Sequence, residues 1–144
     1  MTDHALIRRR DAAQATLDTW STRPLKLGTA DCVRMTASHL RLLGYKVKLP
    51  PSGSYRSVVT ATKRLREAGH ASISDALDAL GLERITPAAA IVGDIILMPA
   101  EHELGALVIS MGNGRVAGWH DDVAGGAVVM QPLMMTAAWR AEPR

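Results

Sequence analysis

The sequence predicts an α+β fold in which N-terminal helices pack on a small antiparallel sheet. Apolar residues recur at helical spacing through the first half of the chain. From residue 93 the pattern changes to short apolar or β-branched runs separated by Gly, Pro and Asn, which is typical of strands joined by tight turns. With 144 residues, of which 47% are hydrophobic and 22% charged, the chain is long enough for one domain covering residues 1–144.

The first two predicted helices have recognisable ends. Thr2 or Asp3 can cap the first helix, and the turn at residues 22–24 ends it. Asp31 can cap the second helix, which begins there, and Gly44 stops it, since glycine is the usual residue after a helix end. Their inward faces are expected to carry Leu6, Ala13, Leu17 and Trp20 in the first helix and Val33, Ala37, Leu40 and Leu43 in the second.

An extended segment and two further helices complete the first half. Residues 45–49 alternate lysine with apolar residues, which predicts a short extended piece. A third helix is predicted over residues 55–68, with Val58 and Val59 facing inward. Ser74 is placed to cap a short fourth helix.

The apolar runs in the second half of the chain predict a meander of four strands. Strands that follow a run of helices indicate the α+β class. A hairpin turn is predicted at residues 112–114 (GNG), because Asn and Gly accept the positive φ that such turns need. The strands are predicted over residues 93–98, 106–111, 115–119 and 127–130.

The residue usage excludes several classes of protein. Phe is absent and there are only two Tyr and three Trp, so the core is expected to be built from aliphatic residues and the seven Met. A single Cys excludes an internal disulfide framework and a cysteine zinc cluster. No apolar run approaches the roughly 18 residues of a membrane span, and the N-terminus lacks the apolar stretch of a secretory signal. We therefore expect synthesis in the cytoplasm without a signal peptide, and no membrane span.

The net charge of +3 is a mild basic excess. Nucleic-acid interfaces usually combine a dense basic patch with stacking aromatics, which five scattered aromatic residues do not supply. The run Arg8, Arg9 and Arg10 is expected to form a solvated face of the first helix. The sequence therefore predicts no nucleic-acid partner, and it indicates no cofactor.

Cys32 is the residue that most clearly indicates a chemical role. It follows a glycine-containing loop and falls in the first turn of the second predicted helix, where the positive helix end favours an anion. A thiol in that position is expected to have a lowered pKa and to act as a nucleophile. The alternative is a small buried side chain with no chemical role.

Several motifs occur in an order that resembles a known family. The NlpC-type cell-wall peptidases, a branch of the papain-like superfamily, have an Asp-Cys helix start, a Gly-Asp strand and a strand ending in Gly-Asn-Gly. The corresponding segments here are residues 28–32 (GTADC), 93–97 (GDIIL) and 107–114 (LVISMGNG). The chain looks still more like a group of small phage and prophage proteins related to these peptidases, which share the segments at 55–57 (YRS) and 138–140 (AWR).

This resemblance implies a papain-like fold and a thiol hydrolase, with Cys32 as its nucleophile, that cuts peptidoglycan stem peptides. The family's base is a His at the start of the strand that ends in Gly-Asn-Gly, and alignment puts Ala106 there. The third polar residue of the family falls on Gly118. Two histidines are candidate replacement bases, because residues an even number of positions apart lie on the same face of a strand. His120 lies about 7 Å along the chain from Gly118, and His102 lies about 13 Å from Ala106.

This resemblance implies two alternative functions, and both belong to a phage or prophage. The chain is either an NlpC-like hydrolase carried in the virion tail or a catalytically inactive relative that serves in tail assembly or at the tail tip. The expected partners are accordingly a peptidoglycan peptide or phage tail proteins. The segments 101–103 (EHE) and 120–122 (HDD) also suit a divalent metal, but no fixed-spacing metal motif is present, so no metal is expected.

Overall fold

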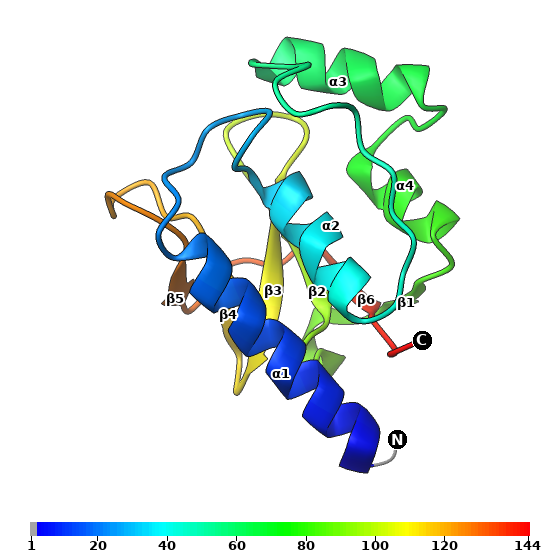
Figure 1. Ribbon diagram of the computed structural model, residues 1–144, viewed down its shortest axis with the longest axis vertical. Helices are drawn as coiled ribbons and strands as arrows, with labels where there is room; N and C mark the ends of the chain where they lie inside the picture. The colour runs from blue at the N-terminus through cyan, green and yellow to red at the C-terminus, as the bar shows by residue number, and fades with distance from the viewer. Residues whose placement is uncertain (1–2) are drawn as a thin grey trace.

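A computed structural model describes residues 3–144, and it confirms the α+β class. Within these residues the chain forms four α-helices and one antiparallel sheet of six strands (Figure 1). The helices are α1 (Asp3–Trp20), α2 (Cys32–Leu42), α3 (Val58–Glu67) and α4 (Ile73–Ala79). The strands are β1 (Glu83–Ile85), β2 (Ile95–Met98), β3 (Ala106–Gly112), β4 (Arg115–Gly118), β5 (Val128–Met130) and β6 (Ala137–Arg140), and a 3₁₀ turn, η1, covers Pro87–Ala89.

The strands are ordered β1-β6-β2-β3-β4-β5 across the sheet. Strands β2 to β5 form the predicted meander, and β6 returns across the sheet to pair with β2 and β1. Helices α1 and α2 pack on each other and on β3, so they cover one face of the sheet (Figure 1). This arrangement presents the N-terminus of α2 to the start of β3.

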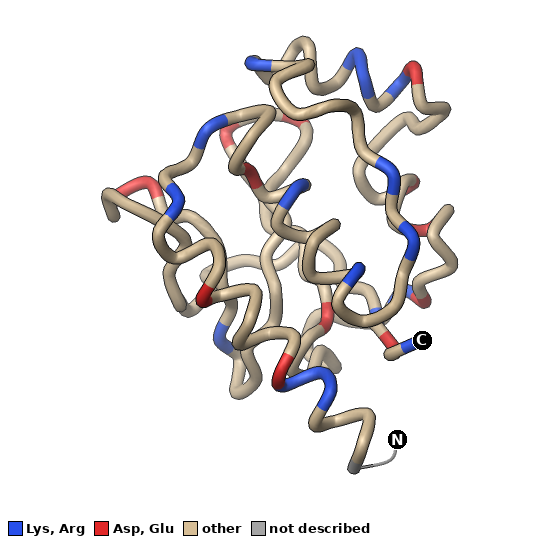
Figure 2. The backbone as a smooth tube through the Cα atoms, viewed as in Figure 1, with Lys and Arg blue, Asp and Glu red and all other residues tan. Residues whose placement is uncertain are grey.

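Charge is concentrated away from the central strands. The central strands β2 and β3 contain no charged residue, as expected for elements that are buried in the middle of the sheet. Lys and Arg are carried by the loop after α1, by α2 and by α3 (Figure 2).

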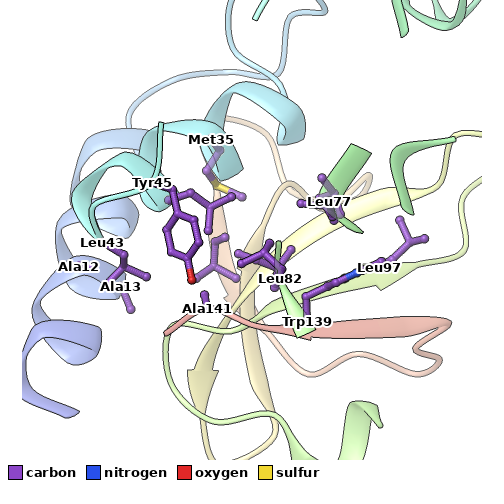
Figure 3. Packing of buried hydrophobic residues seen from close by; sticks show 14 of the residues in the cluster. Ala12, Ala13, Met35, Leu43, Tyr45, Leu77, Leu82, Leu97, Trp139 and Ala141 are labelled. Carbon is purple, nitrogen blue, oxygen red and sulfur yellow. The ribbon is translucent and has the colours of Figure 1, made fainter. Parts of the chain in front are cut away.

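The core has one cluster on each face of the sheet. The larger lies between the helices and the sheet and includes Met35, Leu43, Trp139 and their neighbours (Figure 3). Burying each such side chain stabilises the fold by about 1.5–3 kcal/mol. The smaller cluster, on the opposite face, is formed by Ile96, Val108, Val116 and Ala138.

Helix α1 buries the face that its apolar pattern predicts only in its second half. Ala13 and Trp20 are buried as expected, but Leu6 is 40% exposed while Arg9 is fully buried. The interpretation of Arg8–Arg10 as a solvated run is therefore wrong for its middle member. Of the two predicted caps, Thr2 lies outside the described residues, as does the side chain of Asp3.

The other helices begin and end near their predicted bounds. Ser72 rather than Ser74 caps α4. Ser57 caps α3 in a reciprocal arrangement with Thr60. Val59, predicted to face inward, is 79% exposed, because α3 packs on the molecule through only a narrow side.

The predicted extended piece at residues 45–49 forms no strand, whereas β1 and β6 were not predicted. Strand β1 has three residues, of which only Ile85 is β-branched, and β6 begins with two alanines, so the strand signal is weak in both. The hairpin turn at residues 112–114 is confirmed, with positive φ at all three positions. The Met residues are divided: Met35 is fully buried, but Met134 is 69% exposed.

Candidate functional site

The loop before α2 is organised by the carboxylate of Asp31, which is 2% exposed. One oxygen, Oδ1, accepts the backbone N–H of Arg34 at 2.9 Å and so caps the helix, as predicted. The other, Oδ2, accepts the backbone N–H of Gly28 and the hydroxyl of Tyr55, each at 2.8 Å. Asp31 is therefore fully occupied in holding two loops to the start of α2.

The segments 28–32 and 55–57 form one structural unit. Gly28 has a φ of +93°, and a side chain there would collide with the carbonyl oxygen of Tyr55. The carbonyl of Gly28 also accepts the N–H of Gly53 at 3.0 Å. The glycine, the aspartate and the tyrosine of these motifs are thus explained by backbone geometry and hydrogen bonding, without any reaction.

Cys32 is the first residue of α2, and it packs half-buried against the helix-side core. Burial raises the pKa of its thiol to about 11, with a further rise from the charge of Asp31. Backbone hydrogen bonds from Leu107, Cys32 and Val33 lower the pKa, but they do not offset the burial. The expected lowering of this pKa is therefore wrong, because loss of solvent outweighs the helix terminus.

The two faces of the sheet decide which residues of β3 and β4 can approach Cys32. Leu107 belongs to the helix-side cluster, whereas its neighbour Val108 belongs to the cluster on the opposite face. Side chains alternate along a strand, so Ala106 lies on the face away from Cys32. Gly118 lies on that same far face, where an added Cβ would stand 2.7 Å from a methyl group of Val108.

His102 and His120 are exposed, and both lie beyond the ends of the strands. The Nδ1 atom of His120 accepts the backbone N–H of Asp122 at 3.0 Å, which closes a local turn. In residues 3–144 no hydrogen bond joins either histidine to Cys32. Even spacing does not bring either histidine to Cys32, because Ala106 and Gly118 are on the far face and neither strand extends as far as the histidine.

The helix-side position after β4 is occupied by Trp119 instead of a base. Its ring packs edge-on against Trp20, with ring centroids 6.0 Å apart, and its Nε1–H donates to the carbonyl of Arg23 at 2.8 Å. These contacts tie the end of β4 to the end of α1. They fix the loop that leads to Cys32 but add no titratable group.

A second polar centre, which the sequence analysis missed, surrounds the carboxylate of Asp94. This residue is fully buried and forms an ion pair with Arg9 at 2.8 Å and another with Arg140 at 3.1 Å. It also accepts the backbone N–H groups of Ile91 and Ala141, each at 2.9 Å. The aspartate of the Gly-Asp motif thus joins α1, β2 and the chain after β6.

His39 lies beside this centre, fully buried between α1 and α2. Its Nε2 is 2.8 Å from the carbonyl of Gly93, and its Nδ1 is 3.0 Å from the hydroxyl of Thr16. Burial lowers the pKa of the ring, so His39 is a neutral structural group. No local pattern marks it, because its partners are distant in sequence.

A comparison with known protein families shows to which family the chain belongs. The model of a domain of unknown function, DUF6950, matches residues 6–141. The chain belongs to this family. No curated protein matches it.

The side chains available to this DUF6950 chain limit the chemistry of its site. In the described part of the chain, no three His, Cys, Asp or Glu residues gather closely enough to hold a metal ion. No helix among residues 3–144 has the length and apolar character to cross a membrane. The start of α2 carries one neutral thiol, that of Cys32, and one carboxylate, that of Asp31, whose hydrogen bonds hold the adjacent loops in place.

Proposed function

We propose that the chain is a non-catalytic relative of the NlpC-type peptidases, with a papain-like fold, that serves as a component of a phage or prophage tail. The observation that carries this proposal is the state of Cys32. Its thiol is neutral at physiological pH, and neither strand beside it offers a base on the side that faces it. A thiol hydrolase needs a thiolate and a group that moves its proton.

The order of the elements supports the proposed relationship. A helix that begins with Asp-Cys packs against the strand that ends in Gly-Asn-Gly, and the Gly-Asp strand pairs with that same strand. The Asp31–Tyr55 and Asp94–Arg9 hydrogen bonds give these motifs a structural use. Motif residues that hold the fold together would persist after a loss of activity.

One observation favours the alternative of an active hydrolase. The backbone groups of Cys32 and Val33 at the start of α2 lower the pKa of the thiol, and N–H groups at a helix start are the kind of donors that stabilise a developing oxyanion. An active enzyme would cut peptidoglycan stem peptides and would need His102 or His120 to lie beside Cys32 in the free protein and hold its thiolate. The two proposals therefore differ in the protonation of the Cys32 thiol in the free protein.

The deciding experiment is the rate of iodoacetamide labelling at Cys32 as a function of pH. A free thiol with a pKa of about 8.5 reacts well at neutral pH. With a pKa of about 11, Cys32 should react more than roughly a hundredfold more slowly there, because its thiolate fraction falls in proportion. The variants His102→Ala and His120→Ala should label at the same rate as the unchanged protein.

Rapid labelling at neutral pH that slows when either histidine is removed would contradict the proposal and identify a working Cys–His pair. A short unfolded peptide containing one Cys serves as the reference, and circular dichroism shows that each variant is folded. Cys32→Ser should also leave tail assembly intact. Release of peptides from muropeptides by the folded protein would contradict the non-catalytic function directly.

A further inference from the structure

Charge is unevenly divided along the chain. Residues 21–66 contain ten Lys and Arg and a single acidic residue, Asp31, whereas the rest of the chain contains seven basic and thirteen acidic residues. The mild net charge of +3 therefore combines +9 in the first region with −6 in the second. We call residues 21–66 the cationic region.

The positive charge of this region is not neutralised from within. Asp31 is buried and its carboxylate is occupied by Gly28, Arg34 and Tyr55. Among the described residues, the only ion pair made by a member of the region joins Arg64 to Glu67. The potential of a surface with so many unpaired cations attracts anionic partners over distances of about a Debye length.

Hydrogen bonds hold the loop before α2, α2 itself and the segment before α3 beside one another. The guanidinium of Arg34 donates to the carbonyl of Pro50 at 2.6 Å, and that of Arg41 donates to Val47 at 2.6 Å. Gly53 is bonded to Gly28, so the loop before α2 lies beside the segment that precedes α3. Carbonyl groups are neutral, so these contacts fix the arginines without cancelling their charge. Figure 2 shows basic residues along each of these segments.

The same region exposes large apolar side chains among its cations. Leu25 is 55% exposed, Leu42 is 52% exposed and Val59 is 79% exposed. A hollow of about 390 Å³ lies between α3 and Glu103, with Val58, Val59 and Lys63 in its lining. An occupant that matches this surface needs carboxylates and apolar groups on one flexible backbone.

Nucleic acid is a poorer match for this surface. Base stacking needs exposed aromatic rings. Both tyrosines of the region, Tyr45 and Tyr55, are buried, and Tyr55 donates its hydroxyl to Asp31. The apolar side chains would gain nothing from a phosphate backbone.

We propose that the cationic region is a docking surface for an acidic polypeptide segment that also carries apolar side chains. Its cations attract the carboxylates, and the exposed leucines and the hollow beside α3 bury the apolar side chains. The inference goes beyond the proposed function and does not depend on the chemistry of Cys32. In a tail assembly, the segment would belong to a neighbouring protein.

The test uses the full chain and a fluorescent peptide of glutamates with leucine at every fourth position, followed by anisotropy at low and moderate salt. The double variant Lys46→Glu/Lys63→Glu should weaken binding roughly tenfold or more, since charge reversal at an interface replaces attraction with repulsion. The matched variant Arg10→Glu/Arg115→Glu, which changes exposed residues outside the region, should bind within about twofold of the unchanged protein. A peptide with alanine in place of leucine should bind more weakly.

Three outcomes would overturn the proposal. These are failure of the peptide to bind, equal weakening by the two double variants, and tighter binding of a duplex DNA probe than of the peptide. All four substituted side chains are exposed, and circular dichroism shows whether the variants fold. Cys32→Ser should bind the peptide normally, so failure here is distinguishable from failure of the proposed function.

Discussion

At the scale of single residues, the motif around Cys32 is explained by hydrogen bonding. Asp31 uses one oxygen to cap α2 and the other to hold Gly28 and Tyr55. The same carboxylate raises the pKa of Cys32 through its charge, which opposes a nucleophilic role. The hydrogen bond between Tyr55 and Asp31 is therefore the contact of this motif whose contribution to stability should be measured.

Tyr55→Phe should lower the free energy of unfolding by about 1.5–3 kcal/mol, because it removes a buried hydrogen bond to a charged group. Asp31→Asn keeps a good helix cap but removes the charge that Tyr55 binds. Tyr55→Phe should therefore cost less in the Asp31→Asn background, with a coupling of at least about 0.5 kcal/mol. Urea denaturation of the four proteins measures the cycle, and strictly additive losses would show that the two side chains do not interact.

At the scale of elements, α1 is fixed to the sheet by a polar anchor as well as by apolar packing. Arg9 is fully buried and bonds both the carbonyl of Val92 and the carboxylate of Asp94. Its neighbour Arg10 is exposed and pairs with the adjacent Asp11 on the surface. Adjacent arginines of one run therefore have opposite roles, and this difference can be measured.

Arg9→Met should lower the free energy of unfolding by about 3 kcal/mol, the lower part of the range for breaking a buried ion pair, since Arg140 still compensates Asp94. Arg10→Met should change stability by less than about 0.5 kcal/mol. Thermal or urea unfolding of the two variants makes the comparison. Similar losses for both would show that Arg9 does not anchor α1.

The sequence predicted those elements whose signals are local. Helix α2 has an Asp cap before it and a Gly after it, and the β3–β4 hairpin has Gly-Asn-Gly at its turn, so both were placed correctly. Strand β6 was missed because Ala137–Arg140 becomes a strand only by pairing between β1 and β2, which are distant in sequence. Its position is a long-range packing result that residue propensity does not contain.

The candidate site shows the same division. The capping role of Asp31 follows from local sequence, and it is confirmed. The pKa of Cys32 depends on how deeply α2 packs against β3, and the orientation of Ala106 depends on which face of the sheet the helices cover. Neither property is encoded by spacing along the chain. The predicted solvation of Arg9 failed for the same reason.

At the scale of the whole molecule, the helices and the sheet meet at a buried polar centre. His39 comes from α2, Thr16 and Arg9 come from α1, and Gly93 and Asp94 lead into β2. These groups lie in the interior, far from the solvent that would screen them. Protonation of His39 therefore affects the packing of both helices on the sheet.

The free energy of unfolding should fall as the pH decreases from about 7 to 5, because the pKa of His39 is lowered by burial in the folded chain. In the unfolded chain this histidine takes up a proton below about pH 6.5, so the unfolded state binds more protons and is favoured. One such group contributes a slope of at most about 1.4 kcal/mol per pH unit. Urea denaturation across this range should show a smaller slope for His39→Gln, whereas His4→Gln, which changes an exposed histidine of α1, should keep the slope of the unchanged protein. An identical slope in all three proteins would contradict the prediction, because it would mean that folding does not shift the pKa of His39.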